Sequence, residues 1–212
     1  MKPGTQESEW PGDILAYENL FWSQGRSVAG VDEAGRGPLA GPVIAAAVVL
    51  PEGTQVEGAG DSKKLSRTLR EDLYTEIIAR ASSIGIGTGS VQEIDKHNIL
   101  NATTLAMNRA LTQLSEEPGH VVVDGLPVKN LEWEHEAVVG GDGLVHSIGC
   151  ASIVAKVTRD RLMTGLALRY PGYSWEKNAG YGTALHRAAI KELGFTPHHR
   201  ITFGRLQYEL DV

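Results

Sequence analysis

The most constraining feature of the sequence is an apolar run that ends in two adjacent carboxylates. Residues 28–31 read Val-Ala-Gly-Val, and Asp32 and Glu33 follow directly, just before a Gly-Arg-Gly turn at 35–37. Such a run is typical of a buried strand, and charged side chains at its end are costly to desolvate unless a cation or a hydrogen-bond network compensates them. The pattern therefore predicts a strand with a metal site at its end.

Other apolar or alternating runs predict the remaining strands of a sheet. The run at 41–50 follows 27–31 after a tight connection, so we expect these two strands to pair antiparallel. Glycine alternates at 85, 87 and 89, which favours a strand over a nucleotide-binding loop because no helix start follows in the right frame. The expected strands are 27–31, 41–50, 84–91, 120–124 and 136–139.

Helical periodicity and capping residues predict the segments between these strands. Ser66 is suited to cap a helix that runs to about Ala81, and Leu100, Met107 and Leu111 repeat at helical spacing. The expected helices are 14–24, 66–81, a short acidic helix from 91, 99–114, 148–169 and 183–193. Strands and helices thus alternate along the chain, which indicates the α/β class.

Length and composition allow one α/β domain with appendages. The chain has 212 residues, of which 42% are hydrophobic, enough to fill a core. We expect an N-terminal segment at 1–26 with a short helix, a catalytic domain at 27–170, and a helical extension at 171–212 packed on that domain. We expect the single cysteine, Cys150, to be a buried packing residue.

Charge and hydropathy narrow the class of protein. The longest apolar run, 43–50, is too short to span a bilayer, and the N-terminus has no apolar signal region, so we expect a soluble cytoplasmic protein. The net charge of −6 argues against a protein that coats nucleic acid nonspecifically. It does not exclude a nuclease, because basic stretches at 61–67 and 198–200 can still meet phosphates.

Two further carboxylates follow later strands. Asp124 ends the run at 121–123, and Asp142 lies in Gly-Gly-Asp-Gly just after the expected fifth strand. Adjacent strand ends can bring these groups to Asp32 and Glu33, and oxygen donors without a Cys/His cluster suit Mg²⁺ or Mn²⁺. Two such ions can drive in-line displacement at phosphorus. The alternative is that Asp32 and Asp124 merely cap helices or fix turns.

Several motifs in register resemble the bacterial ribonuclease HII family, the type 2 ribonucleases H. The resemblance spans residues 28–204 and is specific because independent motifs occur in the same order and at the family's separations. The motifs are Val-Asp-Glu-Ala-Gly-Arg-Gly-Pro-Leu-Ala-Gly-Pro-Val (31–43), Asp-Ser-Lys-Lys-Leu-Ser (61–66), Val-Val-Asp-Gly (122–125), Ala-Ser-Ile-Val-Ala-Lys-Val-Thr-Arg-Asp (151–160) and His-His-Arg (198–200).

The resemblance implies a ribonuclease H-like fold, with a mixed five-stranded sheet flanked by helices. It implies a monomeric endonuclease that cuts the RNA strand of RNA–DNA hybrids and incises 5′ of single ribonucleotides in duplex DNA. The products would carry 3′-OH and 5′-phosphate ends. Two divalent ions, Mg²⁺ or Mn²⁺, would be held by the catalytic carboxylates Asp32, Glu33, Asp124 and Asp142.

The resemblance also implies residues that bind substrate. Gly35, Arg36 and Gly37 would read the ribonucleotide, since glycines admit the sugar-phosphate and the 2′-OH distinguishes RNA from DNA. Tyr181 would pack against the deoxyribose that follows the ribonucleotide. Lys63 and Lys64 would contact phosphates of the substrate. The alternatives are a plain tight turn, a surface salt bridge for the arginine, a packing tyrosine and solvated lysines.

Two later motifs have plainer alternatives. Lys156 and Asp160 are spaced for an ion pair on a helix surface. The His-His-Arg segment at 198–200 could contact substrate, but we favour the interpretation that it completes the fold.

The chain departs from the family pattern at four places without losing a carboxylate. It has Leu126 where the family has asparagine, Gly140 in place of lysine, Gly182 in place of proline, and Gly-Cys-Ala-Ser at 149–152 in place of Ser-Ala-Ala-Ser. These changes put efficiency and junction preference in question. The rival hypotheses are a DNA-strand nuclease or transferase, a non-catalytic hybrid-binding protein and, with least support, a dinucleotide-binding enzyme.

Overall fold

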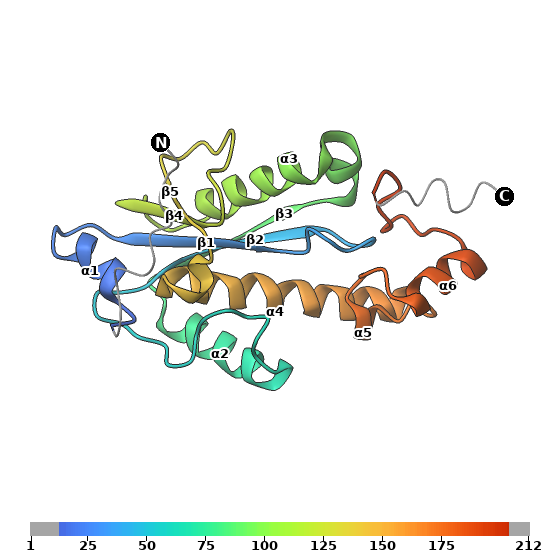
Figure 1. The fold of residues 1–212 in the computed structure, drawn as a ribbon, viewed down its shortest axis with the longest axis horizontal. Coiled ribbons are helices and arrows are strands. Elements are labelled where there is room, and N and C mark those ends of the chain that lie inside the picture. Colours follow the sequence, from blue (N-terminus) through green and yellow to red (C-terminus); the bar gives the residue numbers. More distant parts are fainter. Residues whose placement is uncertain (1–12, 204–212) are drawn as a thin grey trace, which may run out of the picture.

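The computed structural model describes residues 13–203, in which a five-stranded sheet lies between helices (Figure 1). The strand order is β3-β2-β1-β4-β5. β1 pairs antiparallel with β2 and parallel with β4, so the sheet is mixed, and the predicted antiparallel pairing of the first two strands is confirmed. The strands are β1 (Val28–Ala34), β2 (Val43–Val49), β3 (Ser83–Gly89), β4 (His120–Asp124) and β5 (Glu136–Val138).

Long helices cover both faces of the sheet. In Figure 1, α3 lies above the sheet and α4 below it, and α2 lies beyond α4. The sequence helices are confirmed with small shifts: α4 begins two residues earlier than expected, and the acidic helix joins 99–114 across a kink at Asn98. The helices are α1 (Ala16–Trp22), α2 (Arg67–Arg80), α3 (Val91–Thr112), α4 (His146–Arg169), α5 (Trp175–Asn178) and α6 (Ala184–Leu193), with a 3₁₀ turn η1 at Gly141–Gly143.

Local sequence explains where several elements begin. Ser66 is the predicted cap of α2, and its Oγ accepts a hydrogen bond from the Leu69 N–H at 3.2 Å. Ser90 and Glu93 form a capping box at the start of α3. α5 and η1 were not predicted, because a helix of one turn leaves too few residues to show a period.

Small residues let the helices approach the sheet closely. A Cβ at Gly85 or Gly87 would overlap backbone atoms of α3, and one at Gly30 would overlap the backbone of α4 at Ser147. The alternating glycines that predicted β3 therefore have a packing reason. Cys150 is buried in the core on the α4 side, as expected. The close helices make the sheet a rigid platform for groups at its edge.

The segment after α4 packs on the far end of that helix, where Figure 1 places α5 and α6. Tyr173 and Trp175 are buried there with Met163 of α4 and with Leu39 and Ala40 of the loop after β1. The division at 26 and 170 stays a prediction, and residues 1–12 and 204–212 of the two outer segments lie outside the described residues.

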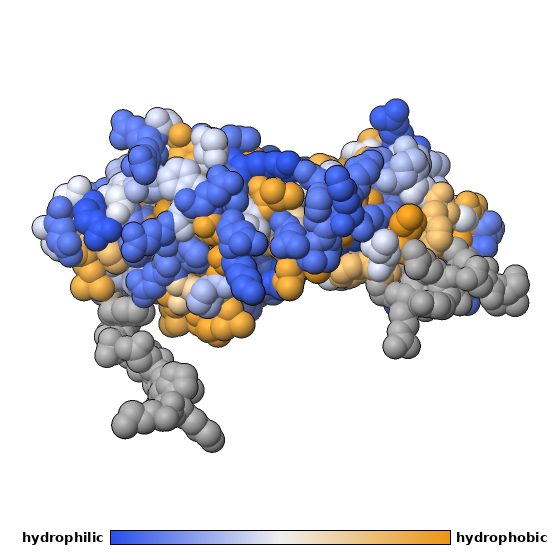
Figure 2. All heavy atoms as spheres, turned by 90° about the horizontal axis from the view of Figure 1, so that it is seen from above, coloured by the Kyte–Doolittle hydropathy of each residue, from blue (hydrophilic) through white to orange (hydrophobic). Residues whose placement is uncertain are grey.

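The outside of the molecule is mixed in character. On the face seen in Figure 2, hydrophilic residues predominate and hydrophobic residues gather only in small patches. Among residues 13–203, no helix is both long enough and apolar enough to cross a membrane.

Candidate active site

Three of the predicted carboxylates meet at the carboxyl edge of the sheet. Asp32 ends the buried part of β1, Asp124 ends β4, and Asp142 lies in η1; one oxygen of each lies within 4.8 Å of the others. The parallel register of β1 and β4 places Val31 opposite Val123, so the next residue of each strand reaches the same edge. The expected convergence of separate strand ends is thus present in the fold.

A hydrogen bond between strand and turn brings in the third carboxylate. Asp124 Oδ1 accepts from the Gly141 N–H at 2.7 Å, which fixes η1 against the end of β4. Gly141 is buried there, and a Cβ at this position would lie 2.6 Å from Ile148 of α4. Asp142, the next residue, is therefore held beside the strand ends by contacts that its local sequence does not reveal.

Glu33, the fourth predicted carboxylate, lies at the same edge of the sheet. It does not belong to the group formed by Asp32, Asp124 and Asp142 in the part of the chain that the structure describes. Successive residues of a strand face opposite sides of the sheet, so the side chain of Glu33 leaves the strand on the other face from that of Asp32. Its Oε1 lies 3.1 Å from Nη1 of Arg36, the salt bridge that was the plain alternative for this arginine. Glu33 nevertheless lines the same cavity as Asp32 and Asp124.

Burial and like charge destabilise the ionised carboxylates. Asp32 is only 5% exposed, and burial raises its pKa, with Glu33 and Asp124 adding to the rise. Burial also raises the pKa of Glu33 against the opposing effect of Arg36, and burial with the charge of Asp124 raises that of Asp142. A bound cation would relieve this repulsion.

The donor set fits a hard divalent cation. All three ligand atoms of the group are carboxylate oxygens, with no histidine or cysteine among them. Carboxylate oxygen suits Mg²⁺ and Mn²⁺, whereas zinc sites favour nitrogen and sulfur donors. The cavity that contains two of these carboxylates has a volume of about 560 Å³ and is open to solvent, which leaves room for a larger ligand.

Two buried serines belong to the site, although the sequence motifs predicted no role for them. Ser62 Oγ and Ser152 Oγ lie 2.9 Å apart, and both residues line the cavity. A hydrogen bond from Ser152 opposes the rise in the pKa of Asp32. Both serines occur within the motifs at 61–66 and 151–160, and that placement was the only signal available in the sequence.

The two lysines predicted to meet phosphates differ in position. Lys63 lines the cavity, and its Nζ lies 3.9 Å from Oδ2 of Asp142. Partial desolvation lowers the pKa of Lys63, but Asp142 and neighbouring carboxylates outweigh it, so the net shift is upward. Lys64 instead pairs with Asp61 at 3.3 Å and is exposed. The geometry thus brings only the first lysine to the carboxylates.

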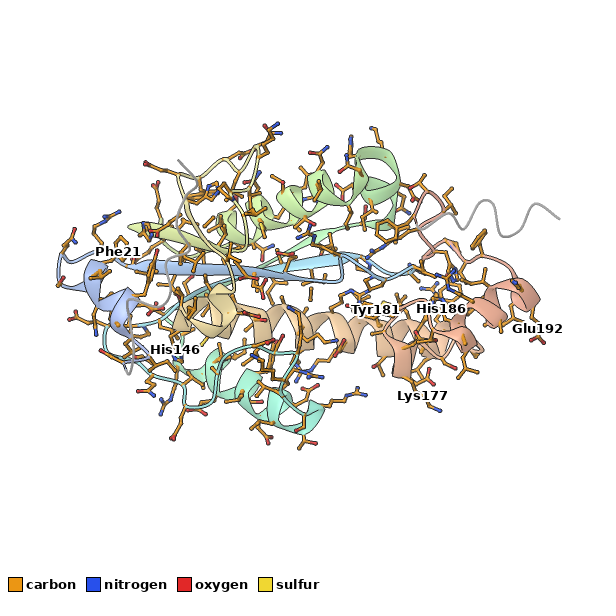
Figure 3. The ribbon with its side chains drawn as sticks, in the orientation of Figure 1. Phe21, His146, Lys177, Tyr181, His186 and Glu192 are labelled. Atoms are coloured by element: carbon orange, nitrogen blue, oxygen red, sulfur yellow. The ribbon has the colours of Figure 1, made fainter. Side chains whose placement is uncertain are left out.

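The Gly-Arg-Gly loop and Tyr181 face the same cavity. Gly35, Arg36, Gly37 and Tyr181 all line it, and a Cβ at Gly37 would lie 3.5 Å from the tyrosine ring. Tyr181 is 46% exposed, so it is not a core packing residue. Figure 3 shows it beside His186, where the chain after α5 meets the start of α6. The absence of a side chain at Gly37 leaves the ring edge accessible.

Residues from the two later motifs have structural partners. Lys156 Nζ and Asp160 Oδ1 form the expected ion pair at 2.7 Å. His199 and Arg200 are buried, which agrees with the interpretation that this segment completes the fold. His198 is half-buried and meets the edge of Tyr170 with ring centroids 5.1 Å apart.

Comparisons with known proteins agree with this geometry. The family model described as "Ribonuclease HII" matches residues 29–210. The ribonuclease HII of Paracoccus denitrificans is 52% identical over 196 residues, which is 92% of each chain, and that of Leuconostoc mesenteroides is 49% identical over 90% of this chain and 75% of its own. The crystal structure of ribonuclease H2 from Pyrococcus horikoshii superposes with a TM-score of 0.74 at 29% identity, covering 87% of this chain and 97% of that one.

Proposed function

The chain belongs to the ribonuclease HII family and is a ribonuclease H, a hydrolase that acts on nucleic acid, and from this premise we propose which bond it cuts. The proposed substrates are the RNA strand of RNA–DNA hybrids and duplex DNA with single embedded ribonucleotides. Incision 5′ of the ribonucleotide leaves 3′-OH and 5′-phosphate ends. The observation that carries the proposal is the cavity that joins Asp32 and Asp124 to the Gly-Arg-Gly loop and Tyr181.

The carboxylates supply the metal site of this proposal. Asp32, Asp124 and Asp142 would hold Mg²⁺ or Mn²⁺, with Glu33 as the fourth acidic ligand. When bound, two such ions supply an activated water and stabilise the leaving oxygen at phosphorus. Ser152 keeps the most buried carboxylate oriented and lowers the cost of its charge.

The opposite wall of the cavity would select the ribonucleotide. Gly35 and Gly37 expose the backbone, so its polar groups can approach a 2′-OH, and Arg36 extends a guanidinium that can meet a phosphate. Tyr181 presents a flat apolar ring at 46% exposure, which suits packing against the next deoxyribose. Lys63 adds positive charge for the phosphate backbone. We also propose that the protein acts in the cytoplasm and that it is a monomer.

A panel of three duplexes tests the proposal. The duplexes carry one ribonucleotide, a run of ribonucleotides or DNA only, and each is incubated with Mg²⁺ or Mn²⁺. We expect cleavage of the first two, 5′ of the ribonucleotide where there is one, and an intact all-DNA duplex. The Asp124→Asn variant keeps the acceptor for the Gly141 N–H and should lose cleavage.

Any other result of this panel would indicate a different function for the protein. Equal cutting of the all-DNA duplex would indicate a nuclease indifferent to the 2′-OH. Binding of the hybrid without product in the presence of metal would indicate a non-catalytic hybrid-binding protein. Full activity of Asp124→Asn would remove the carboxylates from the mechanism.

A further inference from the structure

Two arginines are buried beneath the Gly-Arg-Gly loop. Arg159 of α4 is 1% exposed, and Arg200, which follows α6, is fully buried. Burial lowers the pKa of Arg159 to about 10 and that of Arg200 to about 9, so both are charged at neutral pH. Neither forms an ion pair within residues 13–203; every hydrogen bond that their guanidinium groups make there goes to a backbone carbonyl. Such charges need strong acceptors in place of a counter-ion.

Arg200 holds the loop itself. Its guanidinium donates to the carbonyl oxygens of Gly35 at 2.6 Å, Arg36 at 3.0 Å and Gly41 at 2.8 Å. Its own backbone N–H donates to the carbonyl of Leu39 at 2.9 Å, which ties the segment after α6 to the same loop. The Arg200 side chain thus holds Gly35 and Arg36, which are proposed to read the ribonucleotide. It also holds Gly41, where the loop returns toward β2.

Arg159 holds the remainder of the loop from below. It donates to the carbonyl oxygens of Ala40 at 3.0 Å, Pro42 at 2.9 Å and Ala179 at 2.9 Å. A Cβ at Gly35 would overlap its guanidinium, and Gly35 has a φ of +99°, so glycine is required here both for space and for backbone conformation. The contact with Ala179 joins the loop to the segment that carries Tyr181.

The direction of the carbonyls determines what the loop presents to the cavity. In a trans peptide the C=O and the following N–H point in opposite directions, and the described residues contain no cis peptide bond. Because the carbonyls of Gly35 and Arg36 face Arg200, the N–H groups of Arg36 and Gly37 face away from it, on the side where these residues line the cavity. Two adjacent N–H donors suit the oxygen of a hydroxyl or a phosphate.

We propose that Arg200 is a positioning residue for ribonucleotide recognition, and that it acts by turning the N–H groups of Arg36 and Gly37 toward the substrate. The proposal rests on the proposed function, in which this loop reads the 2′-OH. Arg200 does not line the cavity, so it acts only through the loop. The planar fork of arginine serves three diverging carbonyls, which the point charge of a lysine cannot do.

Binding measurements on the full chain with the Arg200→Lys change test this role. The Asp124→Asn change is added throughout to prevent turnover, and Kd is measured for a duplex with one ribonucleotide and for the same duplex as DNA only. We expect the preference for the ribonucleotide to fall about tenfold, the loss of about one hydrogen bond, while affinity for all-DNA duplex stays within about twofold. Arg161→Lys, on the exposed side of α4, is the matched control and should keep the preference.

A second measurement needs no substrate. In the free protein, the ¹⁵N heteronuclear NOE of the Arg36 and Gly37 amides should fall in Arg200→Lys and remain high in Arg161→Lys, because only the first change releases the loop. A folded Arg200→Lys protein that keeps both the preference and the NOE overturns the proposal. If the starting protein shows no preference at all, the proposed function fails, and the NOE alone decides the positioning role.

A third variant covers the case in which Arg200→Lys does not fold. Gly35→Ala strains the same loop from the other side, because its Cβ would displace the Arg159 guanidinium. We expect the same loss of preference and of NOE, with the thermal unfolding midpoint measured alongside. Unchanged values in both measurements would show that the loop does not need its buried clamp.

Discussion

Two regions beside the cavity compensate buried charge in opposite ways: the carboxylate wall of Asp32, Asp124 and Asp142 at the sheet edge, and the arginine wall of Arg159 and Arg200 behind the Gly-Arg-Gly loop. At the sheet edge, Asp32, Asp124 and Asp142 crowd like charges together, with the exposed Lys63 as a distant counter-charge at 3.9 Å from the last of them. Beneath the loop, Arg159 and Arg200 each satisfy their charge with three backbone carbonyls. A bound cation would compensate the charge of the carboxylate wall, whereas the two arginines already have their hydrogen-bond acceptors within the protein.

This difference in charge compensation separates a region that can bind a ligand from a region that holds the conformation of a loop. Groups whose charge is left uncompensated are the ones that can gain from a ligand, so the carboxylate wall is where chemistry is expected. Groups whose hydrogen bonds are all made cannot gain in that way, and instead hold the backbone in one arrangement. Substitutions in the carboxylate wall should therefore lower activity with little change in the free energy of unfolding. Substitutions in or behind the arginine wall should mainly lower the free energy of unfolding.

The largest expected effect comes from Asp32→Asn. Asparagine keeps the shape and an acceptor for the Glu33 N–H but removes the most buried negative charge. We expect the single-turnover cleavage rate to fall about 1000-fold, since a metal contributes several kcal/mol to the transition state. The free energy of unfolding should not fall, because a destabilised carboxylate has been neutralised.

Asp61→Asn is the matched control for this change. Asp61 pairs with Lys64 and lies outside the group of three carboxylates. Its cleavage rate should stay within about threefold, the scale of a surface ion pair. A stable Asp32→Asn protein with ordinary activity would contradict the assignment of the carboxylate wall as the reactive one.

Metal removal tests the carboxylate wall through both cleavage and thermal stability. Cleavage should stop in EDTA, and Mg²⁺ or Mn²⁺ at about 100 times its Kd should stabilise the fold by about 2.7 kcal/mol. For a domain of this size the thermal midpoint then rises by about 5–10 °C. Differential scanning fluorimetry checks this, and Asp32→Asn should lose most of the rise. An equal rise in that variant would place the cation elsewhere.

The histidine pair behind the arginine wall should give a pH-dependent stability. His199 Nε2 lies 3.1 Å from His186 Nε2, and burial, with His186 adding to it, lowers the pKa of His199 from 6.5 to about 4. The unfolded chain therefore binds this proton more readily, and the stability present above pH 6.5 is lost as the pH falls toward 4. At pH 5 the loss from this group is about 2 kcal/mol.

Chemical denaturation at pH 7 and pH 5 checks this value. The His199→Gln variant should lose about 2 kcal/mol less than the unchanged protein over this interval, because the titrating group is gone while other groups cancel in the comparison. Equal losses in the two proteins would show that the histidine pair does not couple protonation to folding.

The smallest expected effect is that of Lys63→Met. The lysine side chain is exposed and its ion pair with Asp142 is long, so stability should change by less than about 0.5 kcal/mol. The KM for duplex should rise about twofold to threefold, and its salt dependence should weaken by about one phosphate contact. Lys64→Met, whose lysine pairs with Asp61 away from the cavity, should show less of either change.

Much of the fold could be predicted from the sequence because the signals are local. The apolar runs predicted β1, β2 and β4, the alternation of glycines predicted β3, and Ser66 marked the start of α2. The short α5 and η1 were missed, since a single turn has no measurable period.

The candidate site was predictable only in part. Asp32 and Asp124 could be paired from their strand ends, yet the place of Asp142 depends on the hydrogen bond from Gly141 to Asp124. The strand period of two could have shown that the Glu33 side chain leaves the strand on the other face from that of Asp32, but its contact with Arg36 depends on the loop conformation. Nothing in the sequence marked Ser152 as a partner of Asp32.

By itself the sequence determined the types of the longer elements, the family and the residues that carry charge to the sheet edge, because these depend on neighbours a few positions apart. The tertiary structure alone decided how charge is compensated. Arg200 reaches carbonyls at 35, 36 and 41, more than 150 residues earlier in the chain, and no local pattern encodes such a contact. Whether a buried charge waits for a ligand or holds a loop is settled by which acceptors the fold brings to it.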